Sequence, residues 1–311
     1  MLDTTVFVFL GGFAAAAFAI AFVAGFVALD RSPAPALSRA LESALVAFAG
    51  GFLARGFLFG ILALLPHTPG AELTVGWALL LWPGAVDTIG LLFGVQPLAR
   101  SDRLLWLATG VGAFTGMMDG LWRIHRWKGT GPLAFLLDVT WGLAGTTNAC
   151  LFHVHNAAWS GHAQEPRTGA HRYERGFTLV SGFAITQGAV MSNTKSGAGT
   201  ALYAHERAHV WQNRIFGPLY TLTYLAWMVL LFIPGIVAGL VSRAGAGAGI
   251  MGLCYYNNPW EAWAYRVGHR HGASTRTSRG PLIWGDGVVL VASLLFFAAI
   301  IALFSFTLAS L

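Results

Sequence analysis

"LYTLTYLAWMVLLFIPGIVAGLVSRAGAGAGIMGL", residues 219–253, decides how the chain is organised. The segment is apolar and too long to be one comfortable membrane helix, because a bilayer core needs about 20 residues per crossing. Pro234 and Gly235 lie near its middle, where they favour a turn. We therefore predict a membrane hairpin that returns the chain to the side it left. Arg243 falls in the second pass, which we expect to be shallow or partly re-entrant.

The composition of the whole chain indicates a polytopic membrane protein. Of its 311 residues, 56% are hydrophobic and only 10% are charged, which is far from the range of soluble globular domains. The first apolar stretch follows "MLDTT" and is longer than the core of a signal peptide, so we expect a retained membrane helix. The net charge of +6 comes from scattered basic residues. Topogenic charge and contact with membrane lipid explain it better than nucleic acid does.

Further apolar windows along the chain are long enough to cross a bilayer. Five of them predict an N-terminal membrane region, residues 1–152, and together with the hairpin at about 219–253 and a C-terminal transmembrane helix in 281–311 they predict an all-α polytopic protein with about seven to eight transmembrane helices. Residues 153–280, which contain the hairpin, hold most of the polar residues and histidines. The five windows are 6–29, 44–65, 73–94, 104–122 and 132–152.

The distribution of lysine and arginine indicates how the chain is oriented. With the N-terminus outside, most of these residues fall inside, and both polar intervals face the cytoplasm. Arg123, Arg126 and Lys128 are then placed outside, in a loop that disagrees with the rest. We expect a multi-pass protein of a bacterial inner or plasma membrane, with its polar intervals on the cytoplasmic side.

"HERAH", residues 205–209, is a pattern that can bind a metal ion. It lies in a segment without proline or glycine, 201–216, which favours a helix. Positions i and i+4 share one helix face, so His205 and His209 can present two imidazole nitrogens to one ion. Glu206 is adjacent to that face and can take a proton from a water at the ion. The alternative is a chance match or a structural use of the same residues.

A catalytic zinc ion needs a third protein ligand and an open position. After the HExxH pattern, the acidic residues are Glu261 and Asp286, and Asp286 begins the last apolar segment. Pro259 suits the first turn of a helix, with Asn257 or Asn258 near its cap. The alternative role for Glu261 is interaction with the dipole of that helix. The predicted hairpin would return Glu261 to the side of the HExxH pattern.

"HERAHVWQ", followed some fifty residues later by "NNPWEAWAY", resembles the gluzincins, in which HExxH supplies two histidines and a later NPxExxA-type helix supplies a glutamate. The inserted hairpin resembles the integral-membrane zinc metallopeptidases of the heat-shock and CAAX-processing type. The resemblance covers residues 177–266 and implies a small zincin-like α+β site region at the membrane surface. It implies that His205, His209 and Glu261 bind Zn²⁺ and that Glu206 activates water. Those peptidases usually carry "ExxAD", whereas Tyr265 stands at the last position here.

The segment before the HExxH pattern, residues 177–193, has a composition typical of β-strands. The resemblance to gluzincins implies an edge strand that pairs with an extended substrate, and on that basis we assign substrate binding to Ile185, Gln187 and Ala189. The alternatives are a core strand or a hairpin that contacts the membrane.

Residues around the predicted ligands are candidates for supporting roles. Tyr265 and Arg266 are candidate catalytic donors to a developing oxyanion, and His269 is a further one. Gln212 and Asn257 are candidates for orienting the metal ligands. For each of the five, an ordinary role as a surface or capping residue is the favoured alternative.

Two other groups of polar residues invite a role. His153 and His155 are two apart and could form a second metal site, but we interpret them as histidines at the membrane interface. Arg55, Asp87 and Asp138 lie inside apolar windows, where an unpaired charge is costly. We expect Arg55 to pair with one of the two aspartates.

These observations predict a membrane-embedded zinc metallopeptidase that hydrolyses peptide bonds of a peptide or membrane-protein substrate at the membrane surface. One alternative is a zinc hydrolase of a lipid-linked amide or ester that enters from the bilayer. Another is a membrane transport or assembly protein without enzymatic activity, in which the HExxH pattern is structural.

Overall fold

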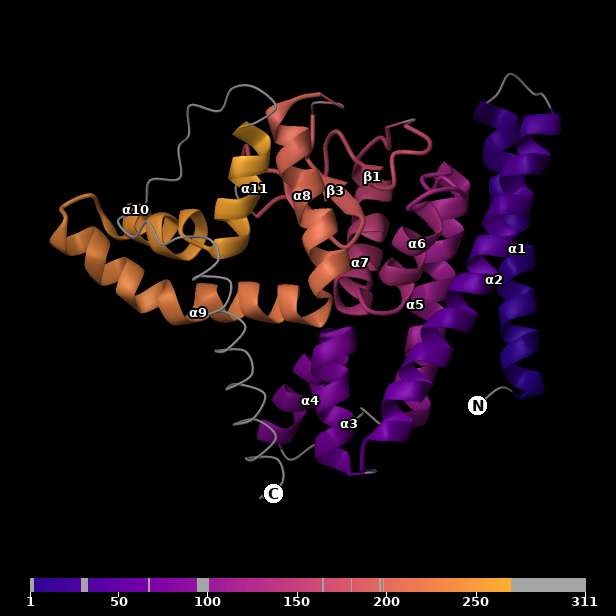
Figure 1. Cartoon of the computed structure of the whole chain (residues 1–311), viewed down its shortest axis with the longest axis horizontal. Coiled ribbons are helices and arrows are strands. Elements are labelled where there is room, and N and C mark those ends of the chain that lie inside the picture. Colours follow the sequence, from indigo (N-terminus) through magenta and orange to yellow (C-terminus); the bar gives the residue numbers. More distant parts are fainter. Residues whose placement is uncertain are drawn as a thin grey trace.

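The computed structural model of the chain describes residues 3–28, 33–66, 68–93, 101–163, 165–179, 181–195, 197 and 199–269. This part is mostly helical and contains one three-stranded sheet (Figure 1). The predicted C-terminal transmembrane helix and Asp286 lie outside the described residues, as does the side chain of His269.

Three long helices form one side of the molecule. They are α1 (Thr4–Ala28), α2 (Pro33–Leu64) and α5 (Ser101–Trp122), and they run along the height of Figure 1. The contact between α2 and α5 requires glycine, since a Cβ atom at Gly112 would collide with the carbonyl oxygen of Gly50. Small residues that allow close approach of backbones are typical of helix pairs in membranes.

In the described part of the chain, four helices are long and apolar enough to cross a membrane: α1, α2, α5 and α9 (Pro218–Val241). The window at 73–94 is instead divided into α3 (Pro69–Val75), the short π-helix η1 (Gly76–Leu80) and α4 (Trp82–Leu92). Leu81, between η1 and α4, has a φ of 60°, which breaks the helix. This window is therefore not one uninterrupted span.

The window at 132–152 is divided as well. It becomes α6 (Gly131–Val139) and α7 (Leu143–Trp159), with a break at Thr140 and Gly142. The Thr140 hydroxyl donates to the Leu136 carbonyl oxygen over 2.5 Å, a local bond that competes with continued helix. The chain thus makes two short helices where the sequence predicted one crossing.

A half-buried cluster of charged side chains bears on the predicted orientation in the membrane. The Glu42 carboxylate of α2 accepts hydrogen bonds from Arg167, at 2.6 and 3.0 Å, and from Arg123, at 2.7 Å. Arg123 and Arg167 therefore lie at the same end of the molecule, whereas the sequence prediction placed them on opposite sides of the membrane. That placement was wrong because it counted α6 and α7 as a single crossing.

The three strands form a small sheet in the order β1-β3-β2. They are β1 (His171–Arg172), β2 (Ile185–Gln187) and β3 (Val190–Ser192). β1 is parallel to β3, and β2 is antiparallel to it, with Thr186 opposite Met191. Strand β2 is thus an edge strand, and it lies against α8 (Ala201–Phe216).

A chain of hydrogen bonds between buried side chains fixes the sheet to α5. Asp119 Oδ1 is 2.8 Å from His171 Nε2, His171 Nδ1 is 2.9 Å from His162 Nε2, and His162 Nδ1 is 2.7 Å from the Ala163 carbonyl oxygen. Asp119 Oδ2 is also 2.8 Å from His125 Nε2, so histidines contact both oxygens of this carboxylate.

His153 belongs to the same buried region. Its Nδ1 is 2.9 Å from the Tyr173 hydroxyl, and its ring packs edge-on against His171. The interpretation of His153 as a histidine at the membrane interface was therefore wrong. The two histidines of "HVH" lie on the helix α7 and not on a strand, so they do not share a face.

A buried ion pair anchors the helix α8. Arg214, near its C-terminal end, binds the Asp138 carboxylate of α6 through Nε at 2.9 Å and Nη2 at 2.7 Å, and both side chains are fully buried. Asp138, one of the two aspartates considered as a partner of Arg55, therefore pairs with Arg214. Arg55 lies over the ring of Trp106 and 3.4 Å from the Thr109 hydroxyl.

The predicted hairpin is present, but its turn lies later in the chain. Helix α9 continues through Pro234 to Val241, and the chain returns along it through α10 (Ala246–Ile250) and the π-helix η2 (Met251–Tyr256). The two arms pack through glycine, because a Cβ atom at Gly249 would collide with the Gly235 carbonyl oxygen. Arg243, predicted within the second pass, lies in the turn at a φ of 56°.

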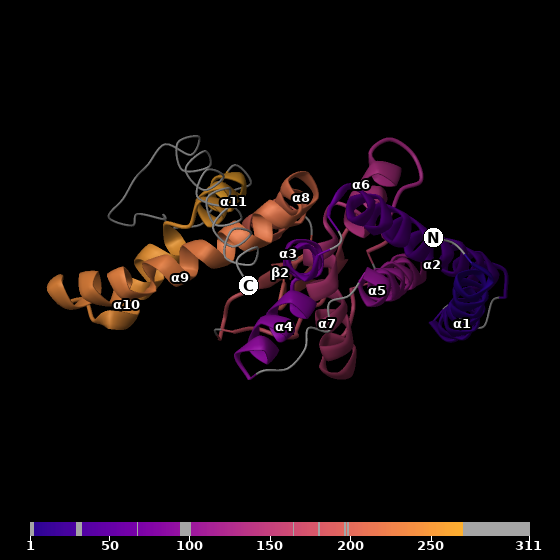
Figure 2. The same cartoon turned by 90° about the horizontal axis from the view of Figure 1, so that it is seen from below.

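The hairpin leads into α11 (Pro259–His269) and brings it back beside α8. Figures 1 and 2 show α9 running across the direction of α2 and α5. Helices α8 and α11, far apart in sequence, thus lie side by side above α9 in Figure 1.

Candidate metal centre

Three buried side chains from two helices converge on one point. His205 and His209 come from α8, and Glu261 comes from the first turn of α11. The two Nε2 atoms are 3.1 Å apart, and the Glu261 carboxylate oxygens lie 3.2 Å from His205 Nε2 and 3.4 Å from His209 Nε2. Two ligand atoms about 2.0–2.1 Å from a tetrahedral zinc ion would be about 3.3 Å apart. The three groups therefore lie close enough together to hold one metal ion.

Hydrogen bonds around the histidines favour metal binding. Gln212 Nε2 donates to the Trp260 carbonyl oxygen over 3.0 Å, so Gln212 Oε1 faces His209 Nδ1 at 2.8 Å as an acceptor. His209 therefore carries a proton on Nδ1, which in the neutral ring leaves the Nε2 lone pair directed at the other two ligands. Glu261 Oε2 is buried without a hydrogen-bond partner in the described part of the chain, as expected of an atom that a metal ion would bind.

The electrostatics of the protein alone also show a tightly coupled centre. Burial acts to raise the pKa of Glu261, but the charges of His209 and His205 beside the carboxylate hold this pKa well below its usual range. Burial acts to lower the pKa of His209, but the attraction of Glu261 outweighs it and raises the pKa to about 9. Without a metal ion, a proton on His209 thus balances the Glu261 carboxylate, and a divalent cation would take the place of this proton.

Glu206 lies beside the three candidate ligands without joining them. Its Oε1 is 3.9 Å from His205 Nε2, and its Oε2 accepts a hydrogen bond from the Thr186 hydroxyl over 2.5 Å. The side chain is 3% exposed and lines the cavity next to the centre. Strand β2 thus holds Glu206 in a position that suits a general base.

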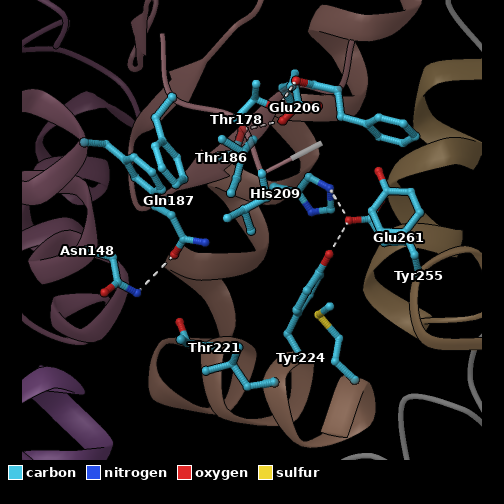
Figure 3. A pocket seen from close by; sticks show the side chains of 18 of the residues that line it. Asn148, Thr178, Thr186, Gln187, Glu206, His209, Thr221, Tyr224, Tyr255 and Glu261 are labelled. Carbon is cyan, nitrogen blue, oxygen red and sulfur yellow. Dashed lines mark hydrogen bonds and ion pairs between the residues drawn. The ribbon is translucent and has the colours of Figure 1, made fainter. Parts of the chain in front are cut away.

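A cavity of about 660 Å³ opens onto the three candidate ligands and Glu206 (Figure 3). Its walls come from α4, α7, α9, η2, strand β2 and the segment before it, and most of the side chains are aliphatic or aromatic. Several of the lining residues are also exposed at the surface: Trp82, Leu151, Leu179 and Leu225.

Two tyrosines of α9 contact the centre, and the sequence analysis did not identify them. The Tyr224 hydroxyl donates to Glu261 Oε1 over 2.7 Å, and the Tyr220 hydroxyl is 3.2 Å from His209 Nδ1 (Figure 3 shows Tyr224). The available signal was their spacing of four residues at the start of an apolar helix, which places both on one face. We had interpreted that segment only as a membrane crossing.

Of the other predicted site residues, some lie at the cavity or contact a candidate ligand, and others do not. Ile185 and Gln187 line the cavity, but Ala189 does not: it is 4% exposed, and its carbonyl oxygen accepts from the His171 N–H. Gln212 contacts a candidate ligand, whereas Asn257 Nδ2 donates to the Gly252 carbonyl oxygen at the end of η2.

The two predicted oxyanion donors lie beside the cavity and not among the residues that line it. The ring of Tyr265 packs edge-on against His205 with centroids 4.4 Å apart, and burial raises its pKa to about 12. Arg266 is exposed.

Neither a protein-family model nor a curated protein nor a solved structure matches the chain. The class of site is therefore defined by its own geometry: a buried His-His-Glu group on two helices, with a second glutamate and an edge strand beside it.

Proposed function

We propose that the chain is a zinc-dependent metallopeptidase of the membrane, with His205, His209 and Glu261 as zinc ligands. The observation that carries the proposal is the convergence of the two Nε2 atoms, 3.1 Å apart, with the two oxygens of the Glu261 carboxylate, at 3.2 and 3.4 Å, and with Glu206 adjacent to them. If the HExxH pattern were a chance match, there would be no reason for a glutamate from a helix some fifty residues later to lie beside the two histidines. A zinc ion there would lower the pKa of bound water and polarise a carbonyl group.

Glu206 has the position and the partners of a proton carrier. As general base it takes a proton from the attacking water, and it then delivers that proton to the leaving amine. The Thr186 hydroxyl bonds one of its oxygens and leaves the other, Oε1, on the side of His205. This arrangement supports one carboxylate acting in both steps.

The edge strand β2 supports a peptide substrate. β2 is bonded to β3 on one side only, and its residues 185–187 line the cavity beside Glu206. An extended peptide can add to such an edge through main-chain hydrogen bonds. Ile185 and Gln187 remain the proposed substrate-binding residues.

Location in a membrane is supported by the four apolar helices. Arg123 and Arg167 meet at one Glu42 carboxylate, which brings the loop with Arg126 and Lys128 to the same end as the polar segment around β1. By the positive-inside rule this end is cytoplasmic. We therefore propose a multi-pass protein of a bacterial inner or plasma membrane with its site on the cytoplasmic side.

The walls of the cavity favour a second candidate, a zinc hydrolase of a lipid-linked amide or ester. Leu225 and Met228 of α9 line the cavity, and the next residues, Val229 and Leu230, are exposed on the same apolar helix. A substrate could therefore reach the centre from the bilayer.

Replacement Glu206→Gln tests the proposed chemistry. The variant should retain zinc and lose turnover by at least about 10²-fold, the usual contribution of a general base. Glu174→Gln is the control, because Glu174 is exposed and pairs with Arg172 over 3.4 Å, away from the three candidate ligands. Turnover is measured with a quenched-fluorescence library of apolar peptides and with membrane proteins whose new N-termini are identified by mass spectrometry. Unchanged cleavage by Glu206→Gln would refute the proposal, and cleavage of lipid amides alone would favour the second candidate.

A further inference from the structure

The cavity next to the candidate metal centre carries no positive charge from the protein beyond its histidines. Among the described residues that line it, none is a lysine or arginine, and the acidic ones are Glu206 and Glu261. Two carboxylates would balance one divalent cation, so an additional anionic group of a ligand would have no partner there. A phosphate or carboxylate is therefore disfavoured, and an uncharged ligand is favoured.

One face of this cavity presents uncharged polar groups. Gln187 of β2, Asn148 of α7 and Thr221 of α9 lie opposite Glu261 in Figure 3. Asn148 Nδ2 donates to Gln187 Oε1 over 3.2 Å, and in this arrangement the Gln187 oxygen is turned towards α7. Gln187 Nε2 has no hydrogen-bond partner in the described part of the chain and points into the cavity (Figure 3). The Thr221 hydroxyl, 5% exposed as a residue, is likewise without a partner there.

A side-chain amide held in this way differs from an ordinary polar residue. Because its oxygen is turned towards Asn148, Gln187 offers the cavity its two N–H donors. The complementary group is an acceptor without charge. On a peptide lying along β2, that group is a backbone carbonyl oxygen.

We propose that Gln187 donates a hydrogen bond to a neutral carbonyl oxygen of an apolar peptide substrate, near the bond that is hydrolysed, and that Asn148 is the positioning residue for this contact. The proposal rests on the proposed peptidase function for the existence of a scissile bond. It adds a substrate class: apolar, uncharged segments with a carbonyl group in reach of β2.

Binding of three probes tests this contact without turnover. N,N-dimethyldodecanamide has a carbonyl acceptor and no N–H, 2-dodecylpyrrole has an N–H donor and no carbonyl, and dodecanoate is an anion. Each is titrated by calorimetry into the full chain carrying Glu206→Gln, in phosphatidylcholine nanodiscs. The dimethylamide should bind most tightly. Gln187→Met should weaken its binding about three- to tenfold, the loss of one neutral hydrogen bond, and leave the pyrrole unaffected.

Asn148→Asp gives a sharper test of the orientation. Aspartate only accepts hydrogen bonds, so Gln187 would turn its Nε2 towards it and present Oε1 to the cavity. The preference between dimethylamide and pyrrole should then reverse. Met228→Leu, which changes a cavity wall without a hydrogen bond, should preserve the original order.

Three results would overturn the inference: tighter binding of pyrrole or dodecanoate than of dimethylamide, unchanged dimethylamide binding in Gln187→Met, or no binding of any probe. Intact binding in a chain that cleaves no peptide would instead count against the peptidase function alone.

Discussion

Replacement of Gln212 by leucine should weaken zinc binding, although Gln212 is not a ligand. The change removes two hydrogen bonds: 2.8 Å to His209 Nδ1 and 3.0 Å to the Trp260 carbonyl oxygen. Loss of a group that orients a metal-bound histidine typically costs 10- to 100-fold in affinity. The Tyr220 hydroxyl, 3.2 Å from the same nitrogen, can still accept its proton, so we expect the lower value, about tenfold or roughly 1.4 kcal/mol.

Asn257→Leu is the matched control. The sequence predicted that Gln212 and Asn257 both orient the metal ligands, but in the structure only Gln212 of these two contacts a candidate ligand. The Asn257 amide bonds Gly252 and no candidate ligand, so zinc affinity should change less than twofold. Both variants are compared by competition with a fluorescent zinc chelator at pH 7.5. The thermal midpoint without metal is recorded as well, because Gln212→Leu leaves the buried Trp260 carbonyl unpaired at a cost of about 1–3 kcal/mol.

The reasoning would be refuted if the two variants weakened zinc binding equally, or if Gln212→Leu left it unchanged. Either result would mean that the His209 tautomer is not set by Gln212.

Three further predictions follow from buried groups. Tyr224→Phe removes the 2.7 Å bond to Glu261 Oε1 and should weaken zinc binding about tenfold in the same chelator assay, while Tyr203→Phe, outside the centre, should not. Asp138→Asn leaves Arg214 as an uncompensated charge in a fully buried site and should lower the free energy of unfolding by about 3–5 kcal/mol, and an unchanged denaturation midpoint would contradict this. Acidification below pH 6.5 should destabilise the chain. Burial and the charge of His171 lower the pKa of His153 well below 6.5 and that of His162 to about 2, so at these two histidines the unfolded chain binds more protons than the folded one in this range. Stability should fall with decreasing pH by at most about 1.4 kcal/mol per unit and per histidine, and His153→Gln should reduce this slope in thermal scans at pH 5, 6 and 7.

The sequence predicted those parts of the site that depend on the spacing of residues within one helix. Histidines four apart on a segment without proline or glycine define one helix face, and His205 and His209 lie on α8 as predicted. Glu261 follows from the need for a third ligand on a helix that begins at Pro259, which is where α11 begins. Both inferences use only helix geometry and helix-start residues.

The contacts between distant segments could not be predicted in this way. Nothing local to Tyr224, Thr186 or Asn148 indicates that each bonds a residue of the cavity, since these bonds depend on how α9, β2 and α7 pack. The same holds for Arg214, which pairs with Asp138, one of the two aspartates considered for Arg55.

Breaks in apolar segments were the second source of error. The hydropathy of residues 73–94 and 132–152 is that of a membrane helix, but Leu81 and Thr140 interrupt the backbone in both. Pro234, expected to mark a turn, lies inside α9, because proline is tolerated within apolar helices when neighbouring groups satisfy the backbone. The turn falls instead around Ser242, Arg243 and Gly245, beyond the end of α9 at Val241.

Zinc content measured by mass spectrometry on the purified chain tests the central claim most directly, with Glu261→Ala and the control Glu174→Ala prepared in parallel. The geometry of His205, His209 and Glu261 predicts one zinc ion per chain in the unsubstituted protein and in Glu174→Ala, and loss of zinc in Glu261→Ala. Equal zinc content in all three proteins, or none in the unsubstituted protein after zinc is supplied, would contradict the account.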